Sequence, residues 1–84
     1  MNKIPPFSKK AKSVRKGTYQ HYKGGYYKVI HIGRNESTLE EVVIYVSKID
    51  SKEIWVRPLD DFLSEVLVND KSILRFTYIE EVST

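Results

Sequence analysis

From residue 17 onward, short runs of apolar and aromatic residues alternate with turn-forming residues, and in several runs the apolar positions recur at every second residue. A period of two is typical of β-strands because successive side chains point to opposite faces of a sheet. In one run, Ile54 and Val56 are expected to face the core. Their neighbours Trp55 and Arg57 then share the outer face. The runs predicted as strands are 17–22, 26–32, 40–47, 53–57, 66–68 and 72–79.

Glycine and polar residues predict the connections between these strands. Lys23-Gly24-Gly25 predicts a tight turn, because glycine accepts a positive φ without steric cost. Asn69-Asp70-Lys71 predicts the turn of a last hairpin, and residues 33–39 predict a polar loop. Pro58 ends a strand and opens one short helical segment over 58–64, whose early carboxylates favour the helix dipole.

These elements together predict a mainly β fold: a small, SH3-like, strongly bent barrel of five or six strands with one short helical turn. Closing the sheet removes exposed strand edges, which otherwise pair without control. A chain of 84 residues is long enough for one domain, which we place at 17–84. A core this small favours completion by self-association into a homo-oligomer.

The net charge of +3 is unevenly distributed along the chain. Residues 1–16 carry six basic residues and no acid, whereas the remainder carries eight basic residues against eleven acids, a formal charge of −3. We expect 1–16 to be a basic, flexible tail, and we favour a solvated, disordered leader over the alternative that it adds sequence-independent attraction to nucleic acid. Its basic residues nearest the domain are Lys9, Lys10, Lys12, Arg15 and Lys16.

Several classes of function lack the residues that they need. There is no cysteine, and two histidines are too few for a histidine-based zinc site. Adjacent Glu40 and Glu41 face opposite sides of a strand, so they do not form a catalytic carboxylate pair. We expect no enzyme, no cofactor and no metal. We find no apolar run long enough to span a bilayer and no signal-peptide pattern, which predicts a cytoplasmic protein.

Short motifs between residues 17 and 76 resemble a small bacterial and phage domain family of unknown function. The resemblance implies a fold and a setting, because the domain accompanies enzymes of nucleotide metabolism in some proteins. This chain departs from the usual pattern in the polar loop, where Asn35 replaces a histidine and Ser37 an acid, and also at Asp61 and Leu74. The matching pieces are His21-Tyr22-Lys23-Gly24, Tyr27, Val29, Thr38-Leu39-Glu40-Glu41, Val43, Tyr45, Trp55-Val56-Arg57-Pro58, Phe62 and Arg75-Phe76.

A planar indole beside a permanent cation suits a ligand with an aromatic ring and an anionic group. We therefore expect the first hairpin and the polar loop to converge with Trp55 and Arg57. Two structural alternatives stand beside this interpretation: the indole caps the open end of the barrel, and the arginines form ion pairs with Glu40, Glu41, Asp60 or Asp61. The candidate ligand-binding residues are His21, Tyr22, Lys23, Arg34, Asn35, Thr38, Trp55, Arg57 and Arg75.

Three functional hypotheses follow from these features. The first is a non-catalytic module that binds a nucleotide-like anionic small molecule and sequesters it, as an anti-defence protein of a phage would. The second is an SH3-like nucleic-acid-binding module that uses the basic tail, against which the acidic charge of residues 17–84 counts. The third is a protein-interaction or inhibitor module anchored by tyrosine, tryptophan and arginine.

Overall fold

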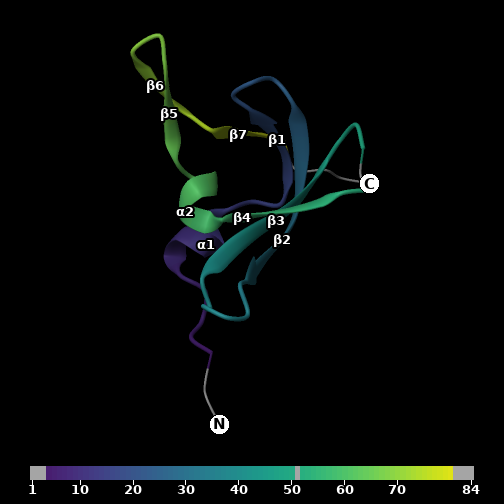
Figure 1. The fold of residues 1–84 in the computed structure, drawn as a ribbon, viewed down its shortest axis with the longest axis vertical. Helices are drawn as coiled ribbons and strands as arrows, with labels where there is room; N and C mark the ends of the chain where they lie inside the picture. The colour runs from purple at the N-terminus through teal and green to yellow at the C-terminus, as the bar shows by residue number, and fades with distance from the viewer. Residues whose placement is uncertain (1–3, 51, 81–84) are drawn as a thin grey trace.

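The computed structural model describes residues 4–50 and 52–80, and these residues form seven strands and two short helices (Figure 1). The mainly β fold predicted from the sequence is confirmed. The elements, in chain order, are α1 (Lys9–Ser13), β1 (Gly17–His21), β2 (Tyr26–Arg34), β3 (Glu41–Ser47), β4 (Ile54–Pro58), α2 (Leu59–Phe62), β5 (Glu65–Val68), β6 (Lys71–Leu74) and β7 (Phe76–Glu80).

Five of the strands form one antiparallel sheet in the order β4-β3-β2-β1-β7, while β5 and β6 pair only with each other. Register shifts in β1 between Thr18 and Tyr19, and in β2 between Val29 and His31, mark bulges, which bend a strand and increase its twist. The sheet is therefore strongly bent, as predicted. Among the described residues β4 and β7 are its two edges, so the sheet does not close into a barrel.

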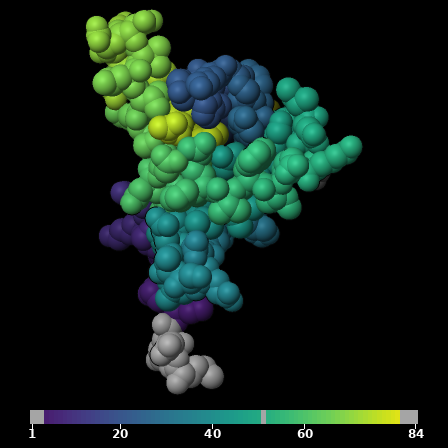
Figure 2. Space-filling view, viewed as in Figure 1, coloured from purple at the N-terminus to yellow at the C-terminus, as the bar shows by residue number. Residues whose placement is uncertain are grey.

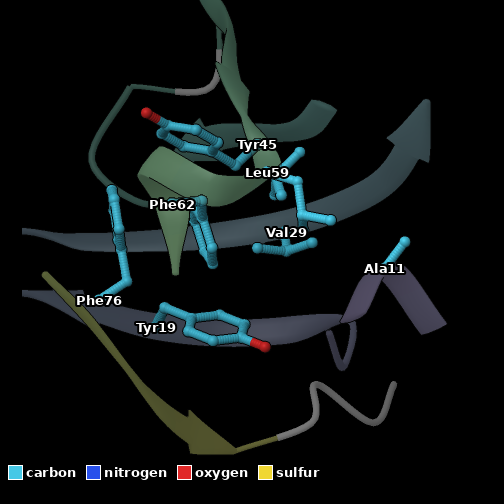
Figure 3. Close-up of a cluster of buried hydrophobic side chains, with 8 residues drawn as sticks. Ala11, Tyr19, Val29, Tyr45, Leu59, Phe62 and Phe76 are labelled. Carbon is cyan, nitrogen blue, oxygen red and sulfur yellow. The ribbon is translucent and has the colours of Figure 1, made fainter. Parts of the chain in front are cut away.

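Aromatic side chains fill the concave side of this sheet (Figure 3). The rings of Phe62 and Phe76 stack with their centroids 4.3 Å apart, and Tyr19 meets Phe62 edge to face. Helix α2 supplies this packing, because Leu59 and Phe62 are its buried residues. The helical segment predicted over 58–64 is thus confirmed as the four residues of α2.

The register of β4 corrects one prediction. Trp55 and Arg57 do share a face, but it is the concave face, because they pair with Tyr45 and Val43 of β3. Ile54 and Val56, expected in the core, are 62% and 60% exposed on the convex face. Alternation decides which residues lie together. It does not decide which face of an edge strand the core covers.

The last predicted strand, 72–79, is two strands in the structure, and Arg75 separates them. The backbone N–H of Arg75 donates to Ser64, and its carbonyl accepts from the N–H of Tyr22. These bonds turn β7 toward β1. The β5–β6 hairpin therefore projects away from the sheet (Figure 1).

The segment 4–16 contacts the core through Phe7, Ala11 and Val14, whereas the sequence predicts a flexible tail. Ser8 caps α1 by accepting a bond from the N–H of Ala11, and Ala11 is 2% exposed within the core. Phe7 packs against the same core, with the guanidinium of Arg34 4.6 Å from its ring. Neither described helix is long and apolar enough to cross a membrane.

Candidate functional site

Four residues line an open pocket of about 200 Å³ on the concave face of the sheet, and we call it the aromatic pocket: Tyr27, Tyr45, Trp55 and Arg57. Three adjacent strands supply them, because β3 lies between β2 and β4. The rings of Tyr27 and Tyr45 meet edge to face at 5.5 Å. Trp55 is 49% exposed, so it lines the pocket without being sealed in the core.

Arg57 is held firmly at this pocket. Its Nε donates to the Tyr45 hydroxyl at 3.2 Å, and its Nη1 donates to Asp61 at 2.6 Å. The bond to Tyr45 is the main cause that raises the pKa of Arg57 above its ordinary value, so the guanidinium stays charged. Nη2 donates to no described residue, and a charge-assisted donor therefore remains for a ligand.

His21 lies beside the pocket among three cations. Its ring contacts Phe76 at 4.9 Å, and its Nδ1 accepts the backbone N–H of Lys23 at 3.2 Å. Burial lowers the pKa of His21 first, and the charges of Arg57, Arg75 and Lys23 lower it further. The imidazole is therefore neutral at pH 7, with its proton on Nε2. The three cations around His21 therefore favour the binding of a negatively charged group beside it.

The structure also bears out part of the ion-pair alternative. Asp61 pairs with Arg57 and lies 4.0 Å from the Nε of Arg75, which itself donates to Ser64 at 3.0 Å. The carboxylate is 44% exposed, so water screens it. Three cations lie near His21, namely Arg57, Arg75 and Lys23, and the carboxylate of Asp61 balances one of these charges. The region around His21 is therefore aromatic and carries a local excess of positive charge.

His21, Tyr22, Lys23 and Arg75 form a connected group next to the aromatic pocket. The rings of His21 and Tyr22 lie 4.6 Å apart. The guanidinium of Arg75 is 6.0 Å from the Tyr22 ring, and the ammonium of Lys23 is 5.8 Å from it. Arg57 links this group to the pocket, because its guanidinium lies 5.6 Å from the Phe76 ring that His21 also contacts.

The polar loop does not join this site, and the predicted convergence of Arg34, Asn35 and Thr38 with Trp55 is wrong. Arg34 lies seven residues beyond Tyr27 in β2, about 23 Å along an extended strand. It donates to the carbonyls of Pro5 and Leu39. The side chains of Asn35 and Thr38 serve the turn itself.

Tyr27, Tyr45 and Asp61 belong to the site, but the sequence analysis did not select them. The sequence predicts Asp61 at the start of the helical segment and as one of four possible ion-pair partners of the arginines, but not as part of a ligand site. The signal was present for Tyr45. Tyr45 alternates with Ile44 and Val46 as Trp55 alternates with Ile54 and Val56, and the antiparallel register places Tyr45 opposite Trp55 on one face.

A second pocket, of about 330 Å³, lies where the N-terminal segment meets the sheet. Glu41 accepts bonds there from the N–H and Oγ of Ser8 at 2.7 and 2.6 Å, and these bonds lower its pKa. The lining also includes Glu40 and Asp60, with Arg34 as its cation. Three carboxylates disfavour an anion, and no group of the described residues has metal-binding geometry. We therefore take the smaller aromatic pocket as the candidate site.

Comparison with known proteins identifies a matching family and a similar crystal structure. Residues 17–78 match the sequence profile of a family described as protein of unknown function, DUF1653. A crystal structure of a protein of that family from Bordetella bronchiseptica is similar, with a TM-score of 0.77 and 28% identity over 88% of this chain and 97% of the other. No curated protein matches the chain.

Proposed function

This chain belongs to the DUF1653 family, and we propose that it is a non-catalytic module that binds a nucleotide-like anionic small molecule. The observation that carries the proposal is the aromatic pocket: a half-exposed indole and two tyrosine rings beside a fixed guanidinium with an unused donor. Stacking surfaces and a cation are what a phosphorylated aromatic ligand requires.

The size of the pocket narrows the part of the ligand that enters it. Pockets for whole drug-sized ligands measure roughly 300–1,000 Å³. The aromatic pocket, at about 200 Å³, suits a single ring system such as a nucleobase. The rest of the ligand then lies over the rim, where Trp55 is half exposed.

The rim also supplies the charge. Arg57, Arg75 and Lys23 are close enough to depress the pKa of His21, so each acts electrostatically on the same small region. A phosphate in that region meets guanidinium groups, which bind two phosphate oxygens at once through paired N–H donors. The site holds no nucleophile–base pair among its residues, so we propose binding and sequestration, with no turnover.

Calorimetry of the full chain against mono-, di- and cyclic nucleotides tests this function. We expect at least one phosphorylated nucleotide to bind, and Arg57→Gln to weaken that binding about tenfold through loss of a charge-assisted contact. Arg34→Gln is the matched control, because it removes the same charge from the far end of β2. Its affinity is expected to stay within about twofold of the wild type.

Three results contradict the proposal: no binding across the panel, equal losses in both variants, or equal binding of phosphate-free nucleosides. Single-stranded DNA and RNA complete the panel. Binding to them that falls steeply with salt and ignores Arg57→Gln supports the nucleic-acid hypothesis, with exposed Lys9, Lys12 and Lys16 as the contacts.

A further inference from the structure

Strand β4 is an uncovered edge of the five-stranded sheet. Within residues 4–50 and 52–80 it pairs only with β3, so one row of its backbone N–H and C=O groups has no strand beside it. Figure 2 shows the green surface that contains β4 crossing the visible face with no other segment over it. Exposed edges of this kind are templates for pairing with another chain.

The convex face next to this edge is aliphatic. The register places Ile44 opposite Val56 and Val46 opposite Ile54, so four β-branched side chains form one patch across β3 and β4. Ile54 and Val56, at the edge itself, are 62% and 60% exposed. Contiguous exposed apolar side chains beside an unpaired edge mark an interaction surface.

We propose that a second copy of this chain covers the edge, with β4 pairing antiparallel to the partner's β4 about a two-fold axis at Val56. Val56 is the midpoint of Ile54–Pro58, so this register uses the whole strand. It places Ile54 opposite the partner's Pro58, which extends the aliphatic patch across the axis. Two-fold contacts close on themselves, so the assembly stops at a dimer.

The sequence of β4 is self-complementary in this register. Trp55 lies opposite the partner's Arg57, and Arg57 lies opposite the partner's Trp55. Directly opposed side chains on one face interact, so each indole packs against the aliphatic stem of the partner's Arg57, whose guanidinium stays bound to Tyr45 and Asp61 of its own chain. A two-fold axis at Arg57 would instead oppose two like charges. The side chains of β4 therefore specify a second copy of this strand as the occupant.

The partner's residues also reach the aromatic pocket. Trp55 and Arg57 line that pocket from the edge strand, and paired strands lie about 4.8 Å apart. The partner's Trp55 and Arg57 thus arrive on the same concave face and extend the pocket toward the axis. This second part rests on the proposed function, whereas the dimer itself does not.

Sedimentation equilibrium of the full chain over a range of concentrations tests the interface. We expect a dimer for the wild type, and for Val56→Lys a dissociation constant raised at least about tenfold, because the two-fold axis at this position would place two like charges directly opposite each other. Leu67→Lys is the matched control on the projecting β5–β6 hairpin, where Leu67 is 78% exposed. It is expected to dimerise like the wild type.

The single tryptophan provides a second readout. Trp55 is half exposed in one chain, so its fluorescence is expected to shift to the blue as the wild type dimerises, but not in Val56→Lys. A circular dichroism melt shows whether each variant folds.

A folded wild type that stays monomeric throughout overturns the inference, as does a dimer lost in Leu67→Lys and kept in Val56→Lys. Nucleotide binding by such a monomer would leave the proposed function standing, whereas a dimer that binds no nucleotide would refute only that function.

Discussion

At one end of β2, Tyr27 joins the aromatic pocket; at the other end, Arg34 leads into the polar loop. Both ends contain the residue types that a ligand site uses, and the sequence analysis selected candidates at both. In the pocket, Arg57 keeps one terminal nitrogen without a described partner, and Trp55 keeps half of its surface exposed.

In the polar loop the polar groups are already occupied by the chain itself. Asn35 Oδ1 accepts the N–H groups of Ser37 and Thr38 at 2.9 and 3.3 Å, and Thr38 Oγ1 accepts the N–H of Glu40 at 3.1 Å. Arg34 stacks on Phe7. Short polar side chains in a turn are used first by their own backbone. A polar residue is therefore a candidate for ligand binding only where the folded chain leaves its donors or acceptors without an intramolecular partner.

The largest effect that separates the two ends concerns stability. Asn35→Ala removes the acceptor of two loop N–H groups and is expected to lower the free energy of unfolding by about 1 kcal/mol. Asn35→Asp retains an oxygen acceptor and serves as the control. Urea denaturation measures both variants, and nucleotide affinity is expected to change in neither. Lost affinity at unchanged stability would instead assign the loop to a ligand.

A smaller effect concerns Asp61, which competes with an anionic ligand for Arg57. Asp61→Asn is expected to strengthen nucleotide binding about threefold, because the pair is partly exposed and screened. Asp60→Asn is the matched control: it removes the neighbouring carboxylate, which pairs with Lys10 at 3.3 Å on the other side of α2. Calorimetry compares the two. Weaker binding in Asp61→Asn alone would show that the carboxylate positions the guanidinium.

The same contrast explains how far the sequence could predict the structure. Strand positions were close, with 53–57 expected and Ile54–Pro58 observed, because alternation and Pro58 are local signals. The fold class followed from them. The covered face of β4 was not predictable from alternation, which is symmetric between the two faces. The buried Ala11 was not predictable either, because one small side chain in a lysine-rich segment leaves no periodic pattern.

Within the site, Arg57 does lie close to His21 of the first hairpin, as the sequence predicts, but on the concave face of the sheet and not on the predicted outer face. The tyrosine walls were not predicted, because their place in the pocket depends on cross-strand pairing. Asp61 was one of four possible ion-pair partners, because the choice among them depends on where α2 docks. The polar loop was selected for its residue types alone. The type of a residue shows whether its side chain is able to bind a ligand. Only the folded structure shows which of its donors and acceptors already have partners within the chain.

The smallest effect concerns pH, and it has opposite signs for stability and for binding. Burial and three neighbouring cations hold the pKa of His21 below its ordinary 6.5. In the unfolded chain this imidazole is therefore protonated near pH 6.5, whereas in the folded chain it is protonated only at a lower pH. The contribution of His21 to stability is therefore complete above pH 6.5 and is lost as pH falls toward the folded pKa.

An anionic ligand reverses the effect, since it favours the imidazolium. Affinity for a cyclic nucleotide, whose phosphodiester keeps its charge, should thus rise between about pH 7.5 and about pH 5.5 while the stability of the free domain falls. Urea denaturation and calorimetry over this range measure both slopes, and His21→Gln should flatten both. If both slopes persist in that variant, the proton belongs to another group, and the pocket end carries no histidine-linked anion site.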